Sequence, residues 1–117
     1  MTAPTAELLA LHDTDPTAFV LAVAAEVEAE ASRVSLGTSS RFDVEDPEKG
    51  AWLVDFLLVV ARGWRGAVDR HQPVCFNSDE APYVYAGCSR CRGGAKAPCP
   101  DLTETADEAL AYLGGPR

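Results

Sequence analysis

Four cysteines and a histidine gather in one third of the chain, and their spacing is typical of metal ligands. Cys88 and Cys91 form a C-x-x-C pair, Cys99 follows in a Pro-Cys-Pro setting, and His71 and Cys75 lie upstream. A C-x-x-C turn can direct two thiolates at one ion about 2.3 Å away, and a distant second pair completes the tetrahedron of structural zinc. We therefore predict a metal-bound knuckle in this segment.

Two ligand sets fit this spacing. The preferred set is His71, Cys88, Cys91 and Cys99, because a histidine at the end of a helix would be held rigidly. The alternative set replaces His71 with Cys75. Four thiolates can hold either zinc or an iron–sulfur cluster, so Zn²⁺ is the predicted cofactor and a cluster is the alternative. If Cys75 binds no metal, it is a small buried hydrophobe, as free cysteine often is.

The remaining residues give no pattern for catalysis. A zinc ion with four protein ligands has no open position for water, which a catalytic zinc requires. His12 stands in a short polar turn, and Asp79 and Glu80 are typical of loop solvation. The C-x-x-C pair lacks the βαβ context of a thioredoxin-like redox motif. We therefore expect no enzymatic activity.

The elements that must position the ligands are predicted to be helices. Asp15-Pro16 and Asp46-Pro47 each join an N-cap residue to a proline suited to the first helical position. The first helix is predicted to run to about Val34, with an apolar stripe on one side and a solvated side marked by glutamates. The stripe is Phe19, Val20, Val23, Val27 and Ala31, and the glutamates are Glu26, Glu28 and Glu30.

The second predicted helix, residues 47–70, is the most apolar element. Three- and four-residue steps predict one core-facing side. That side comprises Trp52, Phe56, Val59, Val60, Gly63, Trp64 and Val68, widened by Leu53 and Leu57. A helix that ends near Arg70 would deliver His71 to the cysteine segment.

Shorter elements are predicted elsewhere. A short helical turn is expected at residues 5–11, and extended pieces at 74–76 and 83–85 could pair as a hairpin. The last helix is expected to start at Asp101, with Asp101 as N-cap and Glu104 completing a capping box.

The predicted fold class is mainly α: a helical hairpin of two long helices plus a metal-bound knuckle and a short C-terminal helix. A chain of 117 residues forms one domain, 1–117. Within it we expect a helical part at 1–70, the knuckle at 71–100 and the C-terminal helix at 101–113.

Charge and hydropathy narrow the classes of partner. The net charge of −8 disfavours nucleic acid and anionic membranes, although residues 61–100 carry 6 basic and 3 acidic residues. The start of the chain lacks the pattern of a secretory signal, and the apolar run at 51–61 is too short to span a bilayer. We therefore expect a cytoplasmic protein with no membrane association, in which the cysteines stay reduced.

The second half of the chain resembles a known group of proteins. The Asp69-Arg70-His71 run, the C-x-x-C pair and the Ala-Pro-Cys-Pro-Asp-Leu run at 97–102 are similar to those of small uncharacterised actinobacterial and actinobacteriophage proteins. The resemblance covers residues 60–113, and Asp101 stands where that group usually has Thr or Ser. It implies a zinc site at His71, Cys88, Cys91 and Cys99, and it implies no particular activity.

The cysteine pattern is also distantly similar to that of WhiB-like iron–sulfur regulators from the same bacteria. On that resemblance Cys75, Cys88, Cys91 and Cys99 would hold the cluster. The chain departs from the family in two ways, because it lacks the Gly-Val-Trp-Gly-Gly turn and ends in an acidic helix instead of a basic tail.

The functional hypothesis is a small structural-zinc protein that acts by protein–protein interaction or regulation, with a phage-encoded origin as one option. The alternative is a WhiB-like redox or transcription regulator. An enzyme with an open zinc site and a nucleic-acid mimic built on the acidic first half are further hypotheses. The sequence names no particular protein partner and no oligomeric state.

Overall fold

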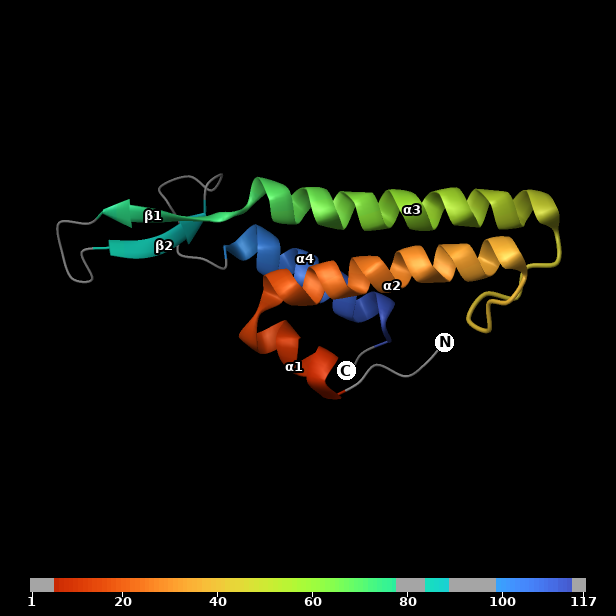
Figure 1. The fold of residues 1–117 in the computed structure, drawn as a ribbon, viewed down its shortest axis with the longest axis horizontal. Coiled ribbons are helices and arrows are strands. Elements are labelled where there is room, and N and C mark those ends of the chain that lie inside the picture. The colour runs from red at the N-terminus through yellow and green to blue at the C-terminus, as the bar shows by residue number, and fades with distance from the viewer. Residues whose placement is uncertain (1–5, 78–83, 89–98, 115–117) are drawn as a thin grey trace.

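The computed structural model describes residues 6–77, 84–88 and 99–114, which form four helices and a two-stranded hairpin (Figure 1). The fold is mainly α, as predicted. The molecule is elongated, with extents of 61 × 27 × 19 Å. Two long antiparallel helices, α2 and α3, run along its length, and the hairpin continues from the end of α3 (Figure 1).

Helix α2, Pro16–Leu36, begins and ends through local chemistry. The Asp15 carboxylate accepts a hydrogen bond from the backbone N–H of Ala18 at 3.1 Å, which confirms the predicted N-cap. The helix ends at Gly37, whose φ of 73° lies in the left-handed region that glycine adopts without strain. The chain then turns back toward α3.

Helix α3, Pro47–Arg70, starts at the second predicted cap. The Asp46 carboxylate accepts a hydrogen bond from the backbone N–H of Glu48 at 2.9 Å. The buried face of α3 follows three- and four-residue steps, which is the helical period. It comprises Leu57, Ala61, Trp64 and Val68.

The predicted core face of α3 was therefore wrong in its first half. Trp52, Phe56 and Val59 were expected in the core, but their side chains are exposed. The first half of α3 carries apolar residues on two sides, and the buried side includes Leu57, which the prediction had also placed on the core face. Helical period groups residues onto faces, but it does not tell which of two apolar faces is covered.

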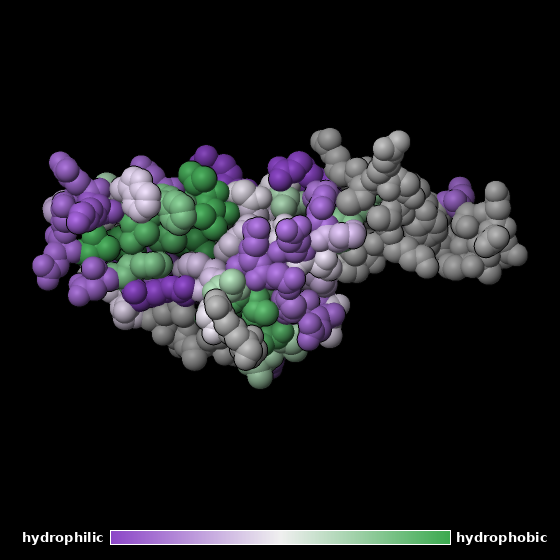
Figure 2. Space-filling view, turned by 180° about the vertical axis from the view of Figure 1, so that it is seen from behind, coloured by the Kyte–Doolittle hydropathy of each residue, from purple (hydrophilic) through white to green (hydrophobic). Residues whose placement is uncertain are grey.

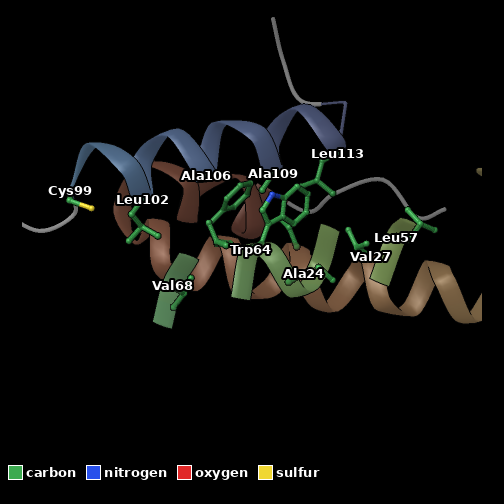
Figure 3. Packing of buried hydrophobic residues seen from close by; sticks show 14 of the residues in the cluster. Ala24, Val27, Leu57, Trp64, Val68, Cys99, Leu102, Ala106, Ala109 and Leu113 are labelled. Atoms are coloured by element: carbon green, nitrogen blue, oxygen red, sulfur yellow. The ribbon is translucent and has the colours of Figure 1, made fainter. Parts of the chain in front are cut away.

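The hydrophobic core joins α2, α3 and α4, Pro100–Tyr112 (Figure 3). Trp64 lies near Ala106 and Ala109 of α4 (Figure 3), and its ring meets that of Tyr112 edge-on at a centroid distance of 6.1 Å. A first helix, α1, Ala6–Thr14, is longer than the predicted turn and packs against α2 and α4.

One charged group on α2 is buried, contrary to the prediction of a solvated side. Glu30 has an exposed fraction of 0 %, and its carboxylate pairs with the Arg33 guanidinium and accepts a hydrogen bond from the Ser39 hydroxyl at 3.3 Å. Arg33 also reaches Glu26 at 2.6 Å. Burial is possible because these partners replace the water that the carboxylate loses.

The hairpin consists of β1, Pro73–Asn77, and β2, Val84–Cys88, which pair antiparallel as expected. Pro73 is opposite Cys88 in the register. The described strands contact each other but no helix. In the ranges that the structure describes, no helix combines the length and apolar character needed to cross a membrane.

Candidate metal centre

Three of the predicted ligands converge at the junction of α3, the hairpin and α4. His71 Nδ1 lies 3.2 Å from Cys88 Sγ and 3.4 Å from Cys99 Sγ. The ligand atoms of all three residues lie within 4.8 Å of one another. Residues 17 and 28 positions beyond His71 in the sequence are thus brought to one point.

The end of α3 fixes the histidine. The backbone N–H of His71 donates to the carbonyls of Ala67 and Val68 at 3.1 and 3.3 Å, so His71 closes the helix as its C-cap. Two residues later Pro73 begins β1 and pairs with Cys88. The hairpin therefore returns Cys88 to the end of the helix where His71 stands.

Helix α4 supplies the third ligand from its N-cap position. Cys99 occupies that position, and its carbonyl accepts a hydrogen bond from the backbone N–H of Thr103 at 3.0 Å. The predicted N-cap, Asp101, instead lies in the first turn, because Pro100 takes the first helical position. The N-terminal end of a helix favours negative charge, which suits a thiolate ligand at Cys99.

The donor set fits zinc. Zn–S bonds of 2.3 Å and Zn–N bonds of 2.0–2.1 Å in a tetrahedron place a nitrogen and a sulfur about 3.5 Å apart. The two nitrogen–sulfur separations at His71 are close to that value. Cys88 and Cys99 are each 1 % exposed, so the thiols are removed from water. One further ligand would complete the tetrahedron.

Asp101 contributes a contact that sequence reasoning missed. Its Oδ2 lies 3.8 Å from His71 Nε2, on the side of the ring opposite the two cysteines. A metal-bound histidine usually directs its other ring nitrogen to a carboxylate or carbonyl, which fixes the ring orientation. The only signal in the sequence was an acid two residues after a ligand cysteine.

The structure does not describe the side chains of the other two predicted ligands, Cys75 and Cys91. Cys91 lies outside the described residues, as do the acids at 79 and 80. Cys75 lies in β1, where its backbone pairs with Ala86, and its side chain is outside the description. The structure thus brings together three members of the preferred set, His71, Cys88 and Cys99.

His12, expected in a polar turn, lies on α1 and links α1 to α4. Its Nε2 is 2.7 Å from the Asp107 carboxylate and its Nδ1 is 2.9 Å from that of Asp13. The Asp107 contact, followed by that of Asp13, raises the pKa of His12 above its ordinary value. The ring also meets Phe19 edge-on. His12 therefore serves the packing of α1.

Comparison of the chain with protein-family models, with curated proteins and with solved structures gave no match. The function is therefore inferred from the geometry of the site and the surface of the molecule.

Proposed function

We propose that this chain is a structural-zinc protein that acts by binding other protein surfaces. The proposed ligands are His71, Cys88, Cys91 and Cys99. One observation carries the proposal: two buried thiols approach the same ring nitrogen of one histidine.

Hydrogen bonding alone accounts poorly for that arrangement. An imidazole nitrogen has either one proton or one lone pair in the ring plane, so it suits one thiol partner. A thiol is also a weak donor. A metal ion between the three atoms satisfies all of them at once, and two thiolates with an imidazole are a common zinc donor set.

The proposed role of the ion is structural. The three side chains come from the last turn of α3, the end of β2 and the start of α4. An ion held by them would cross-link three elements that are distant in the sequence. Metal binding of this kind contributes directly to the free energy of folding. Four protein ligands would leave no position for a substrate.

Binding to another protein surface is supported by features away from the ion. The chain is acidic overall, with a net charge of −8, which disfavours nucleic acid as the partner. Large apolar side chains are exposed on α3. A small domain that keeps such side chains on its surface commonly uses them for association.

Metal analysis of the purified protein tests the proposal. Zinc and iron would be measured by mass spectrometry on anaerobically purified wild type and on Cys91→Ser, Cys99→Ser and Cys75→Ser, together with a visible absorbance spectrum. We expect one zinc per chain in the wild type and in Cys75→Ser, a colourless protein, and zinc loss in Cys91→Ser and Cys99→Ser.

Two results would contradict this assignment. Iron with visible absorbance, lost in Cys75→Ser, would replace zinc with an iron–sulfur cluster on four cysteines. A wild type that holds no metal after purification and after addition of zinc would reject a metal centre altogether. His71→Ala distinguishes the two ligand sets, because only the preferred set loses zinc on that change.

A further inference from the structure

Helix α3 carries a second apolar face, which we call the outer face: Trp52, Phe56, Val59, Gly63 and Gly66. No described part of the chain covers its large side chains. Trp52 is 66 % exposed, Phe56 50 % and Val59 61 %. The rings of Trp52 and Phe56 stack on each other at 5.4 Å, with an angle of 11° between their planes. Figure 2 shows hydrophobic residues at the surface of this part of the molecule.

The outer face has large side chains in its first half and glycines in its second. Its residues recur at steps of four and three, so they form one stripe along the helix. A Cβ added at Gly63 would meet nothing within 4 Å, so the backbone there is open to a close approach. At Gly66 only the flexible end of Arg70 lies nearby, at 3.0 Å.

A hollow lies beside Gly63. It has a volume of about 520 Å³ and is bordered by α3 and α4, with Gly63, Ala67 and Thr105 among its lining residues. On the α3 side, Gly63 and Ala67 line the hollow together with the larger Val60, Trp64 and Arg70. Because the hollow lies next to the outer face, it could accommodate a large side chain of a partner that binds to α3.

Charged residues beside the outer face also differ between its aromatic half and its glycine half. Asp55 and Arg62 are both exposed and stand seven residues apart, which is two helical turns, so they lie on the same side of α3. The acid flanks the aromatic half of the stripe, and the base flanks the glycine half. A second copy of α3 that runs in the opposite direction would therefore place its acidic residue beside the basic residue of the first copy. It would also place its large side chains against the glycines of the first copy.

We propose that two copies of this chain pair through their outer faces, with the α3 helices antiparallel about a twofold axis near Val59. Trp52 and Phe56 of each copy then lie against Gly66 and Gly63 of the other. Asp55 of each copy faces Arg62 of the other, so the axis produces two equivalent ion pairs. The interface is isologous, because the same patch supplies both sides.

The second copy is favoured over an unrelated partner because the face complements itself. Large side chains and a glycine-bordered hollow lie at matched distances on either side of Val59, and so do the opposite charges. Arg70 beside Gly66 also brings a guanidinium close to the incoming Trp52 ring, where a cation–π contact is favourable. This inference rests on the protein-binding role proposed above and names its partner; it uses α3 and the hollow that α3 shares with α4, and it is independent of the zinc site.

Molecular mass in solution, measured by sedimentation equilibrium on the zinc-loaded full chain, tests the proposal. The chain mass is 12.4 kDa, and we expect the wild type to approach twice that mass as its concentration rises. Asp55→Arg and Arg62→Asp should each weaken the dimer at least tenfold, because each places like charges across the axis. The double variant Asp55→Arg/Arg62→Asp should recover dimerisation by restoring both pairs in reverse.

Two further variants complete the experiment. Trp52→Ala should also yield monomer, with unchanged helical circular dichroism because the side chain is exposed. Glu7→Arg, the same change of charge on α1, which does not contact α3, should leave the dimer intact. A wild type that stays at the chain mass at every concentration would overturn the proposal. So would single charge variants that dimerise as the wild type does, or a double variant that fails to recover.

Discussion

The two ends of the molecule are held together by different forces. In the helical body, α2, α3 and α4 bury a continuous apolar cluster that includes Phe19, Val23 and Leu57. At the other end, the hairpin strands contact each other but no helix among the described residues. A two-stranded hairpin alone is marginally stable in water. Among the described residues, the His71, Cys88 and Cys99 cluster lies where the hairpin meets the ends of α3 and α4.

This difference between the helical body and the hairpin end indicates where a metal ion would contribute to the stability of the fold. Burial of apolar surface stabilises the body at about 25 cal/mol per Å², and the body needs no ion for that. From the hairpin, the described part of the chain contributes only Cys88 to that apolar cluster. An ion bound by one side chain from each of three elements would cross-link them there, as the proposed function requires.

The largest expected effect is therefore the loss of order at one end after metal removal. A chelator should remove amide-exchange protection from β1 and β2 while α2 and α3 keep theirs, because the helical core is independent of the ion. Hydrogen exchange read by mass spectrometry checks this. The Cys75→Ser variant with zinc present serves as control, and equal loss of protection in α2 would refute the division into two parts.

The next effect concerns the buried carboxylate in the body. Arg33→Met leaves Glu30 buried without its cation, so we expect a loss of about 2 kcal/mol in the free energy of unfolding. That figure lies below the range for fully buried pairs because Arg33 is partly exposed. Urea unfolding measures it, and Glu30→Gln/Arg33→Met should recover part of the loss.

A matched control for that change exists in a second, more exposed ion pair. Arg65 pairs with Glu28 at 2.6 Å between α3 and α2, and both side chains are about two-fifths exposed. Arg65→Met should cost less than about 1 kcal/mol, because exposed ion pairs contribute little. Equal losses in the free energy of unfolding for Arg33→Met and Arg65→Met would show that the burial of Glu30 does not determine how much its ion pair contributes.

A smaller effect is expected where the two ends meet. Asp101→Asn weakens the carboxylate contact to His71 Nε2 and should lower zinc affinity about tenfold. Competition with a chromophoric chelator measures the affinity. Glu104→Gln, an exposed change one turn further along α4, should leave it unaltered. If both variants bind zinc as the wild type does, Asp101 has no role in orienting the histidine.

The sequence predicted local features better than it predicted burial. Two Asp-Pro pairs marked the starts of α2 and α3, because capping and proline geometry act within a few residues. The C-x-x-C pair at Cys88 and Cys91, followed by Cys99, indicated a ligand set because this spacing is typical of zinc ligands. The helical hairpin was predicted from two long segments in which apolar residues recur at three- and four-residue steps.

The features that sequence reasoning missed depend on contacts across the fold. Trp52 and Leu57 both belong to apolar stripes, and only the approach of α2 selects which stripe is covered. Glu30 was assigned to a solvated side because a glutamate usually faces water, and its burial with Arg33 and Ser39 follows from the packing around it. Asp101 meets His71 only when α4 packs at the end of α3. In each case the burial or contact depends on how the elements pack.

The smallest predicted effect is a pH dependence in the body. The pKa of His12 is raised mainly by the hydrogen bond to Asp107, so the folded state binds a proton more tightly than the unfolded state. The stabilisation is complete below the unfolded pKa of about 6.5 and is lost as the pH rises through the folded pKa. Its size should stay below about 1 kcal/mol because Asp107 is largely exposed.

Urea unfolding of zinc-loaded protein at a series of pH values isolates this contribution. Between the unfolded and folded pKa values of His12, the free energy of unfolding should fall more steeply with pH in the wild type than in Asp107→Asn. Glu108→Gln removes the same charge from an exposed neighbour on α4 and should keep the wild-type slope. The second histidine, His71, and its surroundings are the same in all three proteins, so its contribution cancels in the differences. Identical slopes for wild type and Asp107→Asn would mean that the α1–α4 contact does not depend on a charged His12. The apolar side chains of α1 that pack against the core, Leu8 and Leu11, would then account for its docking without a charged His12.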